Sequence, residues 1–425
     1  MRTLALAYPD ALAGTFYRRH PWGQVIPDAG GLVIYTNHVN GLLDADMPLF
    51  LTDRHQFFLA KPSLFRMPGL GWLIRTVGAI PIYRQKDRVD MSKNTDSFRE
   101  IHRVLREGGA ISLYPEGESR LGFRVRPFKT GAARMVLGAQ DPKGAPIQFV
   151  PVSLLYEEQE TFLSRVHLWV GESFDLMPWM DEYAADGRDI VRKVTEQLHD
   201  RLENLSIPVD GPDEFRVLLN ADRILSDSPD GTAPRVRKLA LAWEGFARRD
   251  QAAADRMSQR LISLGAAFES LGLEARDLQG PTLNRTSSQR LTAAFSLLMV
   301  VLLLPILGPP TALARLIARI GRDTPDKLVT VTVIATSVLV PIWGIVLAYL
   351  LTLVESPLPG FWGTLLGLWA LTYSTRRLSL AWEKPRPLKR ALTGLGLFGR
   401  KQGMCDLWKR KQELRNELRS LFPSC

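Results

Sequence analysis

The apolar run Gly31-Leu32-Val33-Ile34-Tyr35 ends in small polar residues and is followed by His38 and Asp44, with five residues between them. An apolar run of this length predicts a buried strand, so both side chains should lie in the loop at its C-terminal end. Open α/β sheets bind their ligands at that edge. A histidine held by a carboxylate can take a proton from a hydroxyl group and stabilise the resulting charge. The pair therefore indicates a general base; Asp46 is close enough to be an alternative partner of His38.

Several later segments repeat this pattern, in which an apolar run borders a turn with a charged or hydroxyl residue. These segments are Ala60–Phe65, Gly78–Arg84, Leu113–Arg120, Pro127–Arg134 and Phe149–Tyr156. Four parts of the sequence resemble, in order, the four sequence blocks of the glycerolipid acyltransferases, which move acyl chains onto glycerol 3-phosphate or lysophospholipids. They are His38 with Asp44, Gly78–Arg84, Pro115-Glu116-Gly117 and Val150-Pro151-Val152. The resemblance covers about residues 30–175. It implies an α/β acyltransferase domain, a mixed sheet flanked by helices, over residues 1–176.

The resemblance also implies roles for the residues in each block. His38 would be the base, and Asp44 would fix its tautomer. A phosphate on the acceptor needs fixed positive charge, which arginine supplies well. The expected substrate-binding residues are Arg84, Glu116, Gly117, Ser119, Arg120 and Lys129. For Glu116, the alternative is a carboxylate that pairs with a nearby arginine.

Two departures from the common family pattern stand out. The usual first block has four residues between His and Asp, whereas five intervene here, as in a branch that resembles yeast-type glycerol-3-phosphate or dihydroxyacetone-phosphate acyltransferases. The third block reads Glu-Gly-Glu-Ser instead of Glu-Gly-Thr-Arg. Arg120 is the nearest candidate for the role of the missing arginine.

No motif for a metal or a nucleotide competes with this interpretation. The sequence has no HExxH, no CxxC and no Walker-type glycine loop. We therefore expect no metal and no cofactor. The acyl donor, acyl-CoA or acyl-carrier protein, would enter as a substrate.

The chain of 425 residues has a net charge of +10, which suits anionic lipid headgroups and phosphorylated substrates. Nucleic acid is not expected, because the charge does not cluster on a recognisable reading element. Two cysteines are too few for a disulfide framework and suggest a reducing compartment.

The C-terminal third predicts membrane segments. Residues 329–354 carry no charge and are long enough to cross a bilayer, and the uncharged residues 357–375 could return. Basic residues from Arg376 onward place both ends on the cytoplasmic side. We therefore predict a transmembrane hairpin over 329–375 in an integral membrane protein, with a bacterial inner membrane as the expected location and a cytoplasmic catalytic domain.

Three further regions complete the predicted organisation. Residues 177–285 should be helical. Residues 286–328 contain the proline-broken run 291–314, which predicts a re-entrant or interfacial segment, with a third span as the alternative. The tail, 376–425, is basic and amphipathic, with Leu407, Leu414, Leu418 and Phe422 near helical spacing.

The expected function is esterification of a phosphorylated glycerol, most simply glycerol 3-phosphate at its sn-1 hydroxyl, in phospholipid biosynthesis. A lysophospholipid acyltransferase acting on 1-acylglycerol 3-phosphate is the alternative enzyme. A membrane scaffold with an inactive acyltransferase fold is the non-enzyme alternative. The sequence leaves the acceptor, the donor and the oligomeric state open.

Overall fold

The computed structural model describes residues 17–45, 47–67, 70–83, 94–120, 122–159, 164–226, 233–271, 273, 278, 280, 308–320, 327–353 and 401–423. The chain divides into two compact units. Unit 1 comprises Met1–Tyr156 and Arg165–Ile207, and unit 2 comprises Glu157–Ser164 and Pro208–Cys425.

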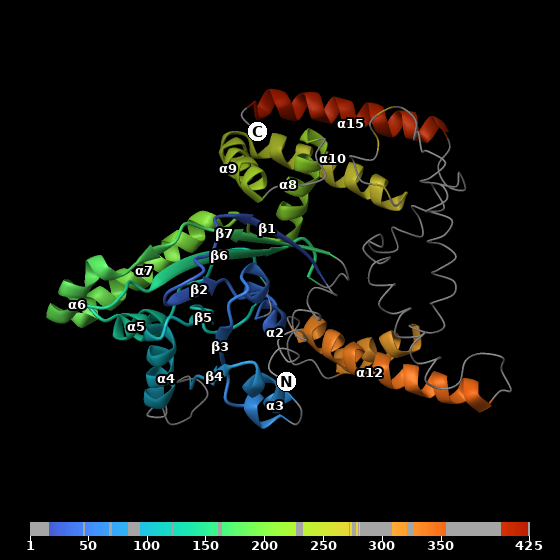
Figure 1. The fold of residues 1–425 in the computed structure, drawn as a ribbon. Coiled ribbons are helices and arrows are strands. Elements are labelled where there is room, and N and C mark those ends of the chain that lie inside the picture. Colours follow the sequence, from blue (N-terminus) through green and yellow to red (C-terminus); the bar gives the residue numbers. More distant parts are fainter. Residues whose placement is uncertain are drawn as a thin grey trace. The chain divides into compact units, whose positions relative to one another are not determined.

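Unit 1 is built on an eight-stranded mixed sheet. Most of its strands can be followed by their labels in Figure 1. In spatial order its strands are β1 (Arg18–Gly23), β7 (Arg165–Val170), β6 (Gln148–Tyr156), β2 (Leu32–Thr36), β5 (Ala110–Leu113), β3 (Gln56–Ala60) and β4 (Ala79–Pro81), and β8 (Phe174–Asp175) pairs with β6. Strand β2 pairs in parallel with both β5 and β6. The carboxyl ends of these three central strands therefore point toward the same edge of the sheet.

Helices and short 3-10 turns connect the strands of unit 1. They are α2 (Gly41–Asp44), η1 (Pro48–Leu51), η2 (Leu64–Arg66), α3 (Leu70–Thr76), α4 (Asn94–Arg106), α5 (Thr130–Ala139), η5 (Met177–Trp179), α6 (Met180–Ala185) and α7 (Gly187–Leu205). Val33 and Tyr35 of β2 join a core with the apolar faces of α4, α5 and α7. Every residue of β2 is buried, as expected for a central parallel strand. The expected mixed sheet flanked by helices is present.

Helix α7 shows how the sequence directs this packing. Its apolar residues Ile190, Val194, Leu198 and Leu202 recur every fourth position and are buried. The Asp186 side chain caps the helix by accepting from the amides of Arg188 and Asp189. The compact unit that contains α7 extends to Ile207; the predicted domain boundary at residue 176 stays a prediction.

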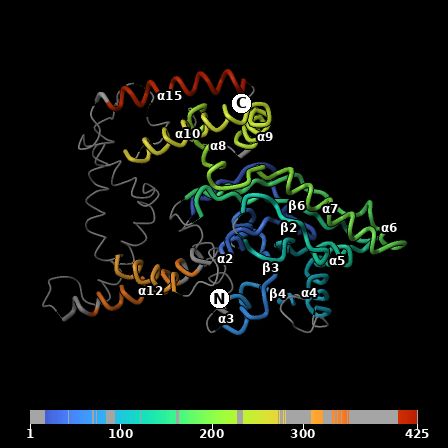
Figure 2. Tube along the Cα trace, turned by 180° about the vertical axis from the view of Figure 1, so that it is seen from behind, coloured from blue at the N-terminus to red at the C-terminus, as the bar shows by residue number. Residues whose placement is uncertain are grey.

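The described part of unit 2 is helical. Its helices are α8 (Pro212–Leu225), α9 (Ala233–Arg249), α10 (Gln251–Ser270), a helix over 308–320, α12 (Lys327–Leu353) and α15 (Lys401–Leu421). Helix α15 contacts α8 and α10, and both views of the chain place it alongside them (Figures 1 and 2). Its residues Leu407, Leu414 and Leu418 are buried. The amphipathic face predicted for the tail is therefore covered by neighbouring helices of unit 2.

The transmembrane hairpin predicted over 329–375 is wrong. Within the described ranges, none of the helices combines the length and the apolar character that a membrane crossing requires. Helix α12 covers the first arm of the predicted hairpin, and it includes the hydroxyl side chains of Thr332 and Thr336. The predicted turn and the second arm, 357–375, lie outside the described residues.

The proline-rich segment before α12 forms a helix over 308–320. Pro309 and Pro310 occupy its first turn, where a backbone N–H has no partner within the helix and proline is tolerated. Pro309 and Pro310, predicted to break an apolar segment, therefore stand at the start of a helix. The preceding residues 281–307 lie outside the described part of the chain.

Candidate active site

The candidate site starts where β2 ends. The Asn37 side chain continues the pairing of β2 with β6: its Nδ2 donates to the Leu154 carbonyl at 2.8 Å, and its Oδ1 accepts from the Leu154 amide at 2.7 Å. Asn37 is buried. The amide thus replaces one step of the strand ladder, and it fixes the backbone immediately before His38.

His38 and Asp44 lie in direct contact. The Nδ1 atom of His38 is 2.9 Å from Oδ2 of Asp44, and the same oxygen accepts from the backbone amides of Val39 and Asn40 at 2.7 Å each. Gly41 begins α2 with φ of 50°, in the left-handed region that glycine adopts readily. This turn lets the chain fold back, so that Asp44 reaches the amides that follow His38.

Two tyrosines from neighbouring strands complete the surroundings of the dyad. Tyr156, at the end of β6, donates its hydroxyl to Oδ1 of Asp44 at 2.6 Å. Burial, and then the charge of Asp44, raises the pKa of Tyr156 well above its usual value, so the phenol stays protonated and donates. Tyr114, directly after β5, stacks on the His38 ring at 4.4 Å and donates to the Asp44 carbonyl at 2.8 Å.

Asp44 is fully buried, whereas 18% of the His38 side chain is exposed. Four donors surround the Asp44 carboxylate, three at Oδ2 and one at Oδ1, which compensates the cost of burying its charge. Since Nδ1 of His38 faces Asp44, Nε2 is the nitrogen left to meet a substrate hydroxyl. This geometry suits proton abstraction by a histidine with a fixed tautomer.

The loop after β5 lies beside the dyad. Gly117 closes a turn by donating its amide to the Tyr114 carbonyl at 3.0 Å, and its φ of 77° favours glycine. The amide of Arg120 donates to the His38 carbonyl at 3.1 Å, and the amide of Lys129 donates to the Pro115 carbonyl at 2.8 Å. These bonds hold the middle of the loop against the backbone of His38 and close the loop between Pro115 and Lys129.

Glu116 in this loop is only 3% exposed and forms an ion pair with Arg126. Burial raises the pKa of Glu116, while Arg126 and, more weakly, His38 oppose that rise. Arg126 also donates to the carbonyls of His38 and Glu118. Of the two interpretations of Glu116, this contact supports a carboxylate that pairs with an arginine.

The other expected site residues fall into two groups. Ser119 is half-buried, and Arg120 and Lys129 are exposed within the same loop; their roles stay predictions. The Arg120 side chain pairs with Glu118 at 2.9 Å. Arg84 and Asp46 lie outside the described residues.

Sequence reasoning missed Tyr114, Tyr156 and Arg126. Tyr114 and Tyr156 stand at the ends of predicted strands, the position that also singled out His38, so strand-end position could have identified both. Arg126 gives no such signal, because it is one of several arginines in the segment Arg120–Arg134 and only the folded loop selects it.

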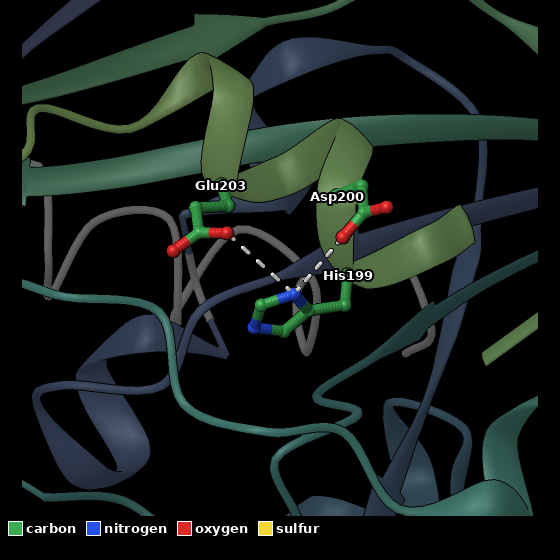
Figure 3. A group of neighbouring side chains, drawn as sticks. All are labelled: His199, Asp200 and Glu203. Atoms are coloured by element: carbon green, nitrogen blue, oxygen red, sulfur yellow. Dashed lines mark ion pairs between the residues drawn. The ribbon is translucent and has the colours of Figure 1, made fainter. Parts of the chain in front are cut away.

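A separate group of polar side chains lies on α7 (Figure 3). His199 Nδ1 is 3.5 Å from Asp200 and 3.8 Å from Glu203, which form the only potential metal-ligand cluster found in the described ranges. Both carboxylates are mostly exposed, with 70% and 56% of their side chains accessible. Exposed carboxylates near a histidine are common on helix surfaces, so the contacts of His199 suit a solvated polar group.

Comparison with known proteins adds a family match. A family model described as Acyltransferase matches residues 22–155, the range that contains the dyad, the Glu116 loop and nearly all of β6. A Brassica napus protein named 1-acyl-sn-glycerol-3-phosphate acyltransferase BAT2 is 26% identical over 141 residues, covering 33% of this chain and 38% of that protein.

Two further relatives differ in the acceptor that they are named for. A Borreliella burgdorferi 1-acyl-sn-glycerol-3-phosphate acyltransferase is 25% identical over 190 residues, which cover 43% of this chain and 70% of that protein. The Saccharomyces cerevisiae glycerol-3-phosphate O-acyltransferase 2 is 28% identical over 145 residues, covering 33% and 19%. This chain spans about a third of the length of the first plant relatives that it matches.

Replacing Tyr156 with Phe should destabilise unit 1 by about 1–3 kcal/mol, because buried Asp44 loses a donor. Replacing Tyr35 with Phe is the matched control. Among the described residues, the buried Tyr35 hydroxyl has no hydrogen-bond partner, so its removal should be neutral or stabilising. Urea unfolding of both variants measures the difference. Equal effects would remove the assigned role of the Tyr156 hydroxyl.

Replacing Arg126 with Ala should cost about 2 kcal/mol of unfolding free energy, because it leaves the buried Glu116 carboxylate without its ion-pair partner. The partial exposure of Arg126, 27%, keeps the loss below that of a fully buried pair. Replacing Arg120, whose side chain is 67% exposed, should cost less than about 1 kcal/mol. Urea unfolding compares the two, and a larger loss for Arg120 would contradict the pairing.

Proposed function

We propose that residues 22–155, which match the Acyltransferase family model and are similar to glycerolipid acyltransferases, form an acyltransferase domain. In this proposal the protein transfers an acyl chain from an activated donor to a hydroxyl group of a phosphorylated glycerol. The observation that carries the proposal is the His38–Asp44 contact at the carboxyl edge of the central strands, within the matched range. The reaction would serve phospholipid synthesis. Thioesters of coenzyme A or acyl-carrier protein are the proposed donors.

In the proposed step, Nε2 of His38 takes the proton from the acceptor hydroxyl as its oxygen attacks the thioester carbonyl carbon. Asp44 holds Nδ1–H and favours the imidazolium that forms. When the tetrahedral intermediate collapses, the carbon–sulfur bond breaks and the thiolate takes the proton from His38. The products are the ester and the free thiol, and no oxidant, reductant or metal enters the balance.

Tyr114 assists by its stacking on His38. An aromatic face 4.4 Å from the imidazole stabilises positive charge on that ring while transfer proceeds. Together with Tyr156, which holds the opposite oxygen of Asp44, it keeps the histidine in one orientation. Both tyrosines are positioning residues in this mechanism.

The first candidate acceptor is 1-acylglycerol 3-phosphate. Four of the relatives are named for that acceptor. Glycerol 3-phosphate is the second candidate, supported by the five-residue spacing between His38 and Asp44 and by the match to the yeast enzyme. Both acceptors present a hydroxyl group close to a phosphate, so one dyad serves either reaction.

The phosphate of the acceptor needs positive charge close to His38. Lys129 is exposed beside Gly117, since a β-carbon on that glycine would lie 3.4 Å from Lys129 Cγ. It directly precedes α5, whose N-terminus adds a favourable dipole for an anion. We assign Lys129 to the phosphate, with Arg120 as a second cation in the same loop.

The proposal is tested with purified protein, labelled acyl-CoA and a panel of acceptors containing glycerol 3-phosphate, 1-acylglycerol 3-phosphate and a lysophospholipid without a terminal phosphate. We expect product from a phosphorylated acceptor and a loss of about two to four orders of magnitude in the His38→Ala variant. His102→Ala is the matched control and should stay active, because His102, on α4, bonds to the Met135 carbonyl of α5. No product from any acceptor, or an active His38→Ala variant, would overturn the proposal.

Replacing Lys129 with Ala should raise the KM for the phosphorylated acceptor about 10-fold or more, and leave the KM for acyl-CoA nearly unchanged, because the charged contact forms in the ground state. Lys143→Ala is the control, since Lys143 is an exposed lysine in the turn before β6, at the opposite edge of the sheet. Steady-state kinetics with each substrate varied in turn measures the effect. Equal rises for both substrates would remove Lys129 from the phosphate site.

A further inference from the structure

The exposed apolar side chains of this chain are unevenly distributed. Of sixteen exposed large hydrophobic residues within the described ranges, nine lie on two helices of unit 2, helix 308–320 and α12. Contiguous exposed apolar surface in a folded protein marks a binding surface more often than chance. These two helices also lie outside the range that matches the acyltransferase model.

Helix 308–320 has the sharper pattern. Its residues Leu313, Leu316, Ile317 and Ile320 are 46%, 54%, 42% and 77% exposed. They occur at positions i, i+3, i+4 and i+7, and at about 100° per residue they share one face roughly a quarter of the circumference wide. The face is therefore an apolar strip that the described residues leave uncovered.

The rest of the helix surface is divided between two other residue types. Ala314 and Ala318, four residues apart, are fully buried and form the side that packs against protein. Arg315 and Arg319, also four apart, are exposed. On a helical wheel the two arginines and the two alanines flank the apolar strip on opposite sides, each centred about 130° from it.

This order of residues fits a helix that lies in a lipid interface. An apolar strip enters the acyl region, while long cationic side chains on the flank extend to the phosphate groups of the lipids. Arginines also occur at protein interfaces, but here two exposed arginines share the uncovered part of the helix with the apolar strip, and anionic headgroups complement both features. The net charge of +10 on the whole chain favours the same partner.

Helix α12 repeats the exposed apolar face. Its residues Val338, Ile342, Ile345, Val346 and Tyr349 are between 39% and 58% exposed and share one side of the helix. Tyr349, near the C-terminal end, is an aromatic residue of the kind that favours the headgroup region. Two successive helices of unit 2 therefore offer apolar faces with interfacial side chains.

We propose that unit 2 docks on the surface of an anionic lipid bilayer through the apolar strip Leu313, Leu316, Ile317 and Ile320, with Arg315 and Arg319 binding lipid phosphates. The purpose of this contact rests on the proposed function, because an amphiphilic acceptor and its product reside in the bilayer. The docking itself is inferred only from the exposed apolar side chains and the two arginines. A lipid-binding experiment without substrate therefore tests the docking separately from the proposed acyl transfer.

The test is flotation of the full-length protein with vesicles of phosphatidylcholine alone and with vesicles containing 30% phosphatidylglycerol, about the anionic content that gives a strong surface potential. The double variant Ile317→Ser/Ile320→Ser should bind both vesicle types at least about 10-fold more weakly than the unaltered protein, because it removes apolar surface from the strip. Leu241→Ser/Ile262→Ser is the matched control, because it removes two exposed aliphatic residues of α9 and α10 in the same unit. The control should bind like the unaltered protein.

Replacing Arg315 and Arg319 with Gln should weaken binding by about fivefold per arginine on the phosphatidylglycerol vesicles and much less on phosphatidylcholine alone. Circular dichroism of each variant verifies that the helices remain folded. Unchanged flotation of the Ile317→Ser/Ile320→Ser variant would overturn the proposal. Loss of self-association in gel filtration without loss of flotation would also overturn it, and would assign the strip to a contact between copies of this chain.

Discussion

The carboxylate of Asp44 organises the site more than any other group in unit 1. It is fully buried, and it accepts hydrogen bonds from a histidine ring, two backbone amides and a tyrosine hydroxyl. A buried carboxylate is stable only when its oxygens accept hydrogen bonds. The fold therefore holds each of these donors within hydrogen-bond distance of Asp44. The orientation of His38 follows from this requirement. The loop between β2 and α2 is thus shaped by an anion inside the protein before any substrate arrives.

Three neighbouring strands supply the residues around the Asp44 carboxylate. Strand β2 delivers His38, β5 delivers Tyr114 and the Glu116 loop, and β6 delivers Tyr156. Parallel pairing of β2 with β5 and β6 brings these carboxyl ends to one edge, so groups up to 118 residues apart in the sequence meet without long connections. The strands themselves are apolar and supply the buried scaffold. The chemistry depends on the residues at and just beyond the end of each strand.

The sequence could predict the parts of this design that local pattern controls. An apolar run ending at Tyr35 predicted β2, and the polar residues that follow it predicted the place of His38 at the carboxyl edge of the sheet, because a buried strand leaves polar residues only at its ends. The partner of Glu116 was not predictable in the same way: Arg120 is closer in sequence, but the folded loop turns Arg126 toward the buried carboxylate. The membrane hairpin over 329–375 was wrong because the absence of charge alone does not establish a membrane span. In the separate segment 291–314, Pro309 and Pro310 indicated breaks, and only the structure places both prolines in the first turn of a helix.

Gly41 carries one further implication, for how such sites are found in sequences. Its left-handed backbone turns the chain between His38 and Asp44, so that the carboxylate reaches the amides beside the histidine across five intervening residues. The contact between His38 and Asp44 therefore depends on where the loop places the carboxylate, and the number of residues between the two side chains matters only through that placement. A search pattern that demands a fixed interval would discard this protein, whereas one that asks for a histidine after a buried strand and a carboxylate able to cap the following amides would retain it.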